Sequence, residues 1–240
     1  MRNRQKICLV IPCYNEEFRL DIKEFLRHCS DDLIFVFVND GSTDNTAEVL
    51  CPHVGRNWHV VSLEKNKGKS EAIRQGALYI KKSGLDKEIT WFGFWDSDLS
   101  IPLAELENFY KFSECFGADA DGVVGSRVKR MGSNISRSLV RHYLGRVFCT
   151  LVSFLFSISY YDTQCGAKIF KKEMLEPGFS EPFNSNWIFD VELLLRLMHH
   201  EIIEYPLHVW QEKPGSKIRF PTVIFEVVRD LVHLKKIYGS

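Results

Sequence analysis

The chain has 240 residues, of which 45% are hydrophobic and 26% are charged. This composition is that of an ordinary globular protein, and it excludes a disordered chain or a protein with several membrane spans. Basic and acidic residues balance at 31 each, so the net charge gives no reason to expect a nucleic acid as partner.

The cysteines and the N-terminus both bear on cellular location. The seven cysteines are odd in number and contain no Cys-x-x-Cys pair, which argues against a disulfide framework or a zinc site and favours a reducing compartment. The first apolar run stops at Pro12, which is too short for a signal peptide or a membrane anchor. We therefore expect a cytoplasmic location.

Short apolar runs alternate with helical patterns in the first half of the chain. Strands are predicted at 7–11, 33–38, 59–63, 89–95 and 121–126, and helices at 20–26, 42–50 and 69–82. Such alternation builds an α/β fold of Rossmann-like type, with a mostly parallel sheet flanked by helices. Ligands of these sheets bind beyond the carboxyl ends of the strands.

The second half begins with a predicted helix over 137–159. Its apolar stripe runs from Val140 to Leu155, and it places Arg137 and Arg141 one turn apart. The most apolar part, 147–158, is too short for a bilayer of about 30 Å, so we expect a core helix or an interfacial one. After this helix we expect a strand at 167–170, a helix at 189–199, a strand at 204–210, and a basic, apolar tail at 220–238.

The triplet Asp96-Ser97-Asp98 directly follows the apolar run 91–95. Two carboxylates at the end of a strand supply the hard oxygen ligands that Mg²⁺ or Mn²⁺ prefers, and they leave positions for diphosphate oxygens. A solvated turn before Pro102 explains the same residues. Both interpretations remain open at this point.

A second polar segment, from Asn39 to Asp44, ends the strand at 33–38. It has the residues of a turn followed by a capped helix. Alternatively, the Asp40 carboxylate accepts a hydrogen bond from a base N–H, while the helix N-terminus favours anions. The two interpretations are compatible because the capping groups and Asp40 are different side chains.

Two nucleotide-binding motifs are excluded. Gly68-Lys69-Ser70 resembles the end of a phosphate-binding loop, but the upstream glycine that this loop needs is replaced by Leu63. The first strand-to-helix turn has no glycine, so the dinucleotide fingerprint is missing and hydride transfer is not expected.

Other polar residues carry weaker signals. The adjacent His199 and His200 lack metal-ligand spacing, and we assign them no catalytic role. Asp190 and Glu192 fall in the first turn of a predicted helix, where they either stabilise its dipole or meet substrate hydroxyls.

A cationic block occupies the middle of the chain. No acid occurs between Gly122 and Tyr161, and this block must face phosphate, lipid headgroups or water. Its basic residues are Arg127, Lys129, Arg130, Arg137, Arg141 and Arg146.

Four ordered motifs resemble those of the inverting GT-A glycosyltransferases. They are Pro12-Cys13-Tyr14-Asn15-Glu16, Asn39-Asp40-Gly41-Ser42, Asn66-Lys67-Gly68-Lys69 and Asp96-Ser97-Asp98. The second half is similar to the polyprenyl-phosphate hexosyltransferases, and most similar to the dolichyl-phosphate glucosyltransferases. The motifs there are Gly125-Ser126-Arg127, Asp162-Thr163-Gln164-Cys165-Gly166, Trp187 with Phe189-Asp190-Val191-Glu192-Leu193, and Gly215-Ser216-Lys217.

This resemblance implies a single GT-A domain over 1–240, with a nucleotide-sugar half (1–130), an acceptor half (131–220) and a C-terminal amphipathic helix (221–240). It implies that Pro12, Tyr14, Glu16, Val38 and Asp40 bind the nucleoside. Asp96, Ser97 and Asp98 are expected to hold the sugar diphosphate, and Asp96, Asp98 and Ser100 the Mg²⁺ or Mn²⁺. Arg127 and Lys217 match phosphate contacts, Arg137 and Arg141 match residues near the lipid phosphate, and Asp98, Arg127 and Arg141 are expected to be catalytic.

The implied reaction transfers a hexose from a nucleotide sugar to a polyprenyl or dolichyl phosphate. Asn39 stands where the family usually has Asp. Gln211 stands where mannosyl-transferring relatives often have Arg, and this second departure favours UDP-glucose over GDP-mannose. The N-terminal anchor of eukaryotic relatives is not seen, so we expect a peripheral protein on the cytoplasmic face of a membrane, with no nucleic acid as partner.

Three alternatives remain at this stage. They are a GDP-mannose-dependent enzyme, a transferase to a glycan or protein hydroxyl that uses Asp190 or Glu192 as its base, and a catalytically silent module that binds a sugar nucleotide or a membrane.

Overall fold

The computed structural model describes residues 5–116, 120–213 and 220–239. The chain forms two compact units, Met1–Leu99 with Gly166–Pro182 and Ser100–Cys165 with Phe183–Ser240. These boundaries separate two groups of residues that pack mainly among themselves. The division into a nucleotide-sugar half and an acceptor half at 130 concerns function and stays a prediction.

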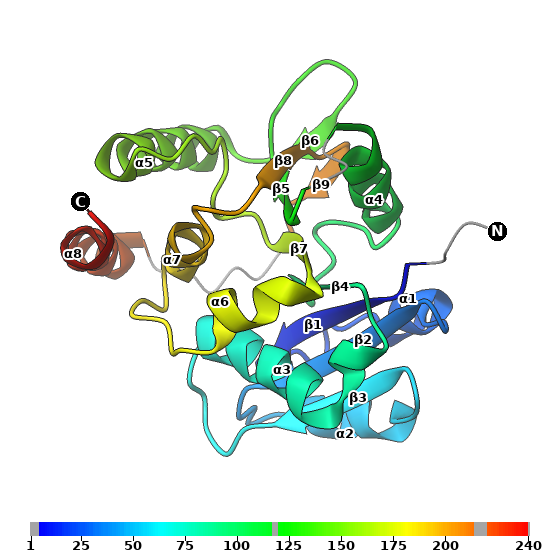
Figure 1. The fold of residues 1–240 in the computed structure, drawn as a ribbon. Coiled ribbons are helices and arrows are strands. Elements are labelled where there is room, and N and C mark those ends of the chain that lie inside the picture. The colour runs from blue at the N-terminus through cyan, green and yellow to red at the C-terminus, as the bar shows by residue number, and fades with distance from the viewer. Residues whose placement is uncertain (1–4, 117–119, 214–219, 240) are drawn as a thin grey trace. The chain divides into compact units, whose positions relative to one another are not determined.

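The first unit is built on a sheet with strand order β3-β2-β1-β4-β7 (Figure 1). Its strands are β1 (Ile7–Cys13), β2 (Leu33–Asn39), β3 (Trp58–Ser62), β4 (Trp91–Trp95) and β7 (Ala167–Lys171). The first four are parallel, and β7 runs antiparallel to β4. Strand β2 is buried along its whole length, as its unbroken apolar run predicted.

Helices pack on both faces of this sheet. They are α1 (Ile22–His28), α2 (Thr46–Leu50), α3 (Lys69–Ser83) and α6 (Leu175–Phe179), with single 3₁₀ turns at Cys51–His53, Leu85–Lys87 and Lys172–Met174. On one face α3 approaches so closely that a β-carbon at Gly76 would lie 2.4 Å from Val10 Cγ1. On the other face the ring of Phe25 meets Phe35 and Phe37 edge-on, with centroids 5.4 and 5.1 Å apart.

In the described residues of the second unit there are two short parallel strand pairs and four helices. Strand β5 (Gly122–Ser126) pairs with β8 (Ile202–Pro206), and β6 (Asn134–Ser136) pairs with β9 (Val209–Gln211). The helices are α4 (Glu105–Phe116), α5 (Leu139–Phe156), α7 (Phe189–Arg196) and α8 (Phe220–Tyr238). Buried residues of α5, α7 and α8 form one core cluster, which includes Val152, Val191 and Leu231.

The structure confirms the α/β class and the mostly parallel pairing, and it corrects several elements. The predicted strand at 204–210 is two strands, because the chain changes partner after Pro206. The Leu207 N–H still donates to the Ser126 carbonyl at 2.9 Å, whereas the His208 carbonyl accepts from Asn134 N–H at 2.7 Å. Helices α4 and α6 and strand β6 were not predicted.

The start of α5 is also corrected. Ser138 has extended backbone, and its side chain accepts a hydrogen bond from Arg141 N–H, which makes it the N-cap. Arg137 therefore precedes the helix. The prediction that Arg137 and Arg141 lie one turn apart on one helix is wrong.

Candidate active site

The polar loops of the first unit meet at one edge of its sheet. Strands β1 and β2 pair in register up to Cys13 and Asn39, and β4 runs parallel to β1. The loop residues that follow these strands therefore share the carboxyl edge, where ligands of such sheets bind. Of the residues predicted to bind the nucleoside, Glu16, Val38 and Asp40 are buried, and Pro12 and Tyr14 are partly exposed.

Backbone and side-chain hydrogen bonds join the β1 and β2 loops. The N–H groups of Asn15 and Glu16 donate to the hydroxyls of Ser42 (3.1 Å) and Thr46 (2.9 Å). Asn39, which replaces the usual Asp, accepts from Ser42 N–H through its amide oxygen at 3.1 Å. The two loops thus form one rigid support.

Asp40 organises the loop that precedes α3. Its two carboxylate oxygens accept hydrogen bonds from the N–H groups of Lys67 (2.8 Å) and Gly68 (2.9 Å). Burial raises the pKa of Asp40 above its usual value, although the two N–H donors act in the opposite direction. Each oxygen already has one partner, so the predicted contact with a base would use a remaining lone pair and stays a prediction.

The acidic triplet follows β4 without a break. Asp96 N–H donates to the Gly166 carbonyl at 3.0 Å, and Leu99 N–H donates back to the Asp96 carbonyl at 3.2 Å, which closes a turn. The carboxylates of Asp96 and Asp98 are partly exposed, whereas Ser97 is buried. This turn holds both carboxylates at the surface of the sheet edge.

Both carboxylates of the triplet have cationic partners. Lys69 Nζ lies 2.5 Å from Asp96 Oδ1, and Arg19 Nη2 lies 3.4 Å from Asp98 Oδ2. Neither Lys69 nor Arg19 was expected at this site from the sequence. The only signal for Lys69 was its place in the Asn66-Lys67-Gly68-Lys69 motif.

The carboxylates of Asp96 and Asp98 are suited to a divalent ion that also binds water and phosphate. Among the described residues, no three His, Cys, Asp or Glu side chains gather at one point, so a site made of protein ligands alone is not formed there. Two neighbouring carboxylates suit an ion such as Mg²⁺, which takes one or two carboxylates and completes its shell with water and phosphate oxygens. The third predicted metal residue, Ser100, is buried in the second unit, where its carbonyl accepts from Gln211 N–H at 2.9 Å.

The second unit holds the candidate acceptor residues. The Arg127 guanidinium donates two hydrogen bonds to the Asp162 carboxylate, from Nε to Oδ2 at 2.6 Å and from Nη2 to Oδ1 at 2.8 Å. Burial alone would raise the pKa of Asp162, but the charge and hydrogen bonds of Arg127 outweigh it and lower this pKa to about 2. Arg127 is therefore already committed to a structural pair, and its predicted phosphate contact would be additional.

Arg137 lies in a small pocket beside α5. The pocket is lined by Arg127, Arg137, His142, Gly145, Arg146, Cys149, Tyr161 and Asp162. Gly145 makes room for the guanidinium, since a β-carbon there would lie 2.9 Å from Arg137 Nη2. Burial, and then the charge of Arg127, lower the pKa of Arg137. The pocket wall is thus rich in positive charge.

His142 and Arg146 also line this pocket; His142 was not singled out from the sequence, and Arg146 was named only as a member of the cationic block. They are one helical turn apart on α5, a spacing that gives two side chains the same face. Arg146 also donates to the Tyr161 carbonyl at 2.7 Å and stacks 3.5 Å over that ring. Arg141, by contrast, pairs with Glu212 and does not line the pocket.

Glu192 is a structural residue. It is fully buried, and it accepts hydrogen bonds from Asn184 N–H at 2.7 Å, from the Asn184 amide at 2.8 Å and from Arg196 at 2.7 Å. Glu192 thus links the loop at Asn184 to α7 by hydrogen bonds, in addition to any stabilisation of the helix dipole. The predicted phosphate contact Lys217 lies outside the described residues.

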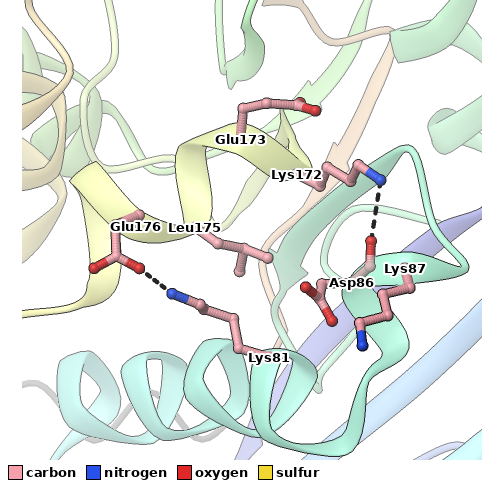
Figure 2. Close-up of a pocket in the computed structure, with 7 residues that line it drawn as sticks. All are labelled: Lys81, Asp86, Lys87, Lys172, Glu173, Leu175 and Glu176. Atoms are coloured by element: carbon pink, nitrogen blue, oxygen red, sulfur yellow. Dashed lines mark hydrogen bonds and ion pairs between the residues drawn. The ribbon is translucent and has the colours of Figure 1, made fainter.

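Another pocket, of about 270 Å³, lies elsewhere in the first unit (Figure 2). Three lysines and three acids line it together with Leu175. Lys81 pairs with Glu176, and Lys172 Nζ donates to the Asp86 carbonyl at 3.2 Å. Lys172 N–H also bonds to Thr90, just before β4, so this pocket is at the opposite end of β4 from the triplet. The three positive and three negative side chains balance, so this pocket shows no charge that favours a sugar nucleotide.

The outer face of α5 is apolar. Most of the predicted stripe is exposed, as Val140, Leu144 and Val147 illustrate with 67%, 46% and 68% exposure, and Phe154 beside it is 84% exposed. Within the described part of the chain, Leu139–Phe156 is a helix long and apolar enough to cross a membrane, with a mean hydropathy of 1.3. The expectation that this segment is too short to span considered only its most apolar part, 147–158, and the helix of that length and composition begins earlier, at Leu139. Because its other face packs in the core cluster, length and composition alone do not make it a span.

Comparison with known proteins matches this architecture to one family. Residues 8–179 match the family model for glycosyl transferase family 2. Dolichyl-phosphate beta-glucosyltransferase from Saccharomyces cerevisiae is 31% identical, over 97% of this chain and 75% of its own length. The Homo sapiens protein of the same name is also 31% identical, over 89% and 70%.

A solved structure confirms the predicted GT-A type of fold. Glucosyl-3-phosphoglycerate synthase from Mycobacterium tuberculosis, in complex with Mn²⁺, UDP and phosphoglyceric acid, superposes with a TM-score of 0.70 at 19% identity. The match covers 98% of this chain and 79% of that one.

Proposed function

The chain belongs to glycosyl transferase family 2, and we propose that it transfers glucose from UDP-glucose to dolichyl phosphate or a related polyprenyl phosphate, with inversion. The observation that carries this proposal is the acidic triplet at the carboxyl edge of the first unit, beside the joined β1 and β2 loops. The choice of sugar and acceptor is supported by relatives whose names specify both.

Donor binding is assigned to the first unit. Pro12, Tyr14, Glu16, Val38 and Asp40 would hold the nucleoside, and Ser97 with its two neighbouring carboxylates would face the diphosphate. The joined loops support this assignment because they keep the nucleoside residues on one rigid edge. Rigid support is what positions a donor for in-line attack.

A divalent ion, Mg²⁺ or Mn²⁺, would be held by Asp96 and Asp98. Structural neighbours were solved with Mn²⁺ or Mg²⁺ together with UDP, which supports the choice of ion. When bound, such an ion stabilises the negative charge that develops on the leaving diphosphate.

Acceptor binding is assigned to the second unit. Arg137 and Arg141 would attract the phosphate of the lipid, while Arg127 and Lys217 keep their predicted role as contacts of the sugar-nucleotide phosphates. A phosphate monoester has its second pKa near 6, so its oxygen is largely ionised at neutral pH and needs no general base. The burial and full pairing of Glu192 support this view, because that carboxylate is not available to deprotonate a hydroxyl.

The membrane is the remaining partner. We place the outward stripe of α5 and the exposed apolar residues of α8, such as Phe225 and Val228, in the interface of the cytoplasmic leaflet. The basic residues of the cationic block would add electrostatic attraction to anionic lipid.

One experiment tests the reaction. The protein is incubated with UDP-glucose, GDP-mannose and other UDP-sugars, each with a short polyprenyl phosphate, and products are identified by mass. Glucosyl phosphoryl polyprenol from UDP-glucose is the expected product. A mannosylated product would identify the mannosyltransferase instead, and UDP binding without any product would identify a silent module.

A further inference from the structure

Arg19 joins two acidic groups of the candidate active site. Its Nη1 lies 3.2 Å from Glu16 Oε1 and its Nη2 lies 3.4 Å from Asp98 Oδ2. The Arg19 N–H also donates to the Glu16 carbonyl at 2.9 Å, which closes a turn in the loop between β1 and α1. The loop that carries Glu16 therefore also presents a guanidinium to the triplet.

This cation occupies a carboxylate that the proposed function assigns to a metal ion. A guanidinium on Asp98 Oδ2 takes up a lone pair that the ion would use, and its positive charge repels a divalent cation. Lys69 stands in the same relation to Asp96. Each carboxylate of the triplet is thus neutralised by a side chain from another element.

The Arg19–Asp98 ion pair is weak enough for another anion to replace Asp98 as the partner of Arg19. It is longer than the Lys69–Asp96 pair, and its side chains are 29% and 25% exposed, so water screens their attraction. Phosphate oxygens bind a guanidinium through two parallel hydrogen bonds, a stronger arrangement than the single contact seen here. A diphosphate at this edge would therefore compete well for Arg19.

We propose that Arg19 is an internal counter-cation of Asp98, which keeps the affinity for divalent ions low until a nucleotide diphosphate draws the guanidinium away. The consequence is a coupling in which metal and nucleotide bind better together than apart. This inference rests on the proposed function in assigning Asp98 to the metal and the nucleotide diphosphate to the same edge.

The test compares Mn²⁺ binding by the full chain with and without saturating UDP, measured by electron paramagnetic resonance of free Mn²⁺. Without UDP, Arg19→Ala should bind Mn²⁺ about two- to fivefold more tightly than the wild type, the range expected for loss of a screened ion pair. The ratio of the dissociation constants without and with UDP should fall. Arg19→Gln, which keeps most of the length but not the charge, should change in the same direction.

Two controls make the result decisive. Arg27→Ala removes an exposed guanidinium that pairs with Glu24 on α1, and it should leave both constants unchanged. Unchanged or weaker Mn²⁺ binding in both Arg19 variants, with wild-type unfolding transitions, overturns the inference. If Asp98→Ala abolishes Mn²⁺ binding in that case, the metal assignment stands and only the role of Arg19 falls. If Asp98→Ala keeps wild-type affinity, the assignment and the inference fall together.

Discussion

Gly166 lies directly against the carboxylate of Asp96. A β-carbon at position 166 would be 1.8 Å from Asp96 Oδ2, and the Gly166 carbonyl accepts a hydrogen bond from Asp96 N–H at 3.0 Å. The residue before β7 thus supports the backbone of the triplet and leaves space for its first carboxylate. Any side chain at 166 would push that carboxylate aside.

We therefore expect Gly166→Ala to impair donor use. A displacement of about 1 Å in a positioned group can reduce kcat/KM by roughly 100-fold. The measurement is kcat/KM for UDP-glucose, together with calorimetric binding of UDP. Gly55→Ala is the matched control, because the nearest atom to a β-carbon there is 3.9 Å away. Equal activity of the two variants would refute a positioning role for Gly166.

Asp98→Ala should abolish the part of UDP binding that depends on divalent ions. Without this carboxylate, the proposed ion loses one of its two strongest protein ligands. Calorimetry with and without EDTA measures the effect, and the variant is expected to bind UDP as the EDTA-treated wild type does. UDP binding that still responds to EDTA as the wild type does would move the metal site elsewhere.

Arg141→Ala should weaken use of the lipid phosphate while sparing UDP-glucose. Loss of one charge-assisted hydrogen bond costs about 1.5 to 3 kcal/mol, which corresponds to roughly a 10- to 100-fold higher KM for the acceptor. Steady-state kinetics with each substrate varied in turn separates the two effects. Glu212→Gln removes the ion-pair partner of Arg141 and should not raise the acceptor KM. Equal losses for donor and acceptor would contradict the assignment.

The Arg127–Asp162 pair should make stability depend on pH. The pKa of Asp162 is lowered to about 2 in the folded protein from a usual 3.8, so its contribution is fully present above pH 3.8 and is lost as the pH falls toward 2. A shift of this size corresponds to about 2 kcal/mol. Urea unfolding of the wild type and Asp162→Asn between pH 7 and pH 3 is the measurement. The difference in free energy of unfolding should be constant near neutrality and shrink below pH 3.8; a constant difference throughout would be inconsistent with this prediction.

Phe154→Ser should reduce membrane binding without destabilising the fold. This ring is 84% exposed on α5, so its loss should change the free energy of unfolding by no more than about 0.5 kcal/mol. If the ring enters the lipid interface, its removal should weaken binding to anionic vesicles by roughly tenfold. Co-sedimentation measures this, and Phe18→Ser, which removes a ring that is 92% exposed in the first unit, is the control. Equal behaviour of both variants would argue against α5 as the docking face.

Local patterns were sufficient for the elements that position the donor site. Unbroken apolar runs identified β1, β2 and β4, because strands buried on both faces need such runs. The acidic triplet could be placed at a strand end for the same reason, and the order of the motifs indicated the family.

Tertiary structure decided which groups meet at the site. Arg19 and Asp98 are 79 positions apart, and Gly166 is 70 positions from Asp96, so no local period relates them. Likewise, the Ser138 cap removed Arg137 from α5 and turned it toward Gly145, and a change of strand partner divided β8 from β9. By itself, the sequence determined the buried strands β1, β2 and β4, the acidic turn and the family, because these depend on residue type and short spacing. Only the tertiary structure decided the cations on the triplet and the outward face of α5, because these depend on contacts between segments distant in the chain.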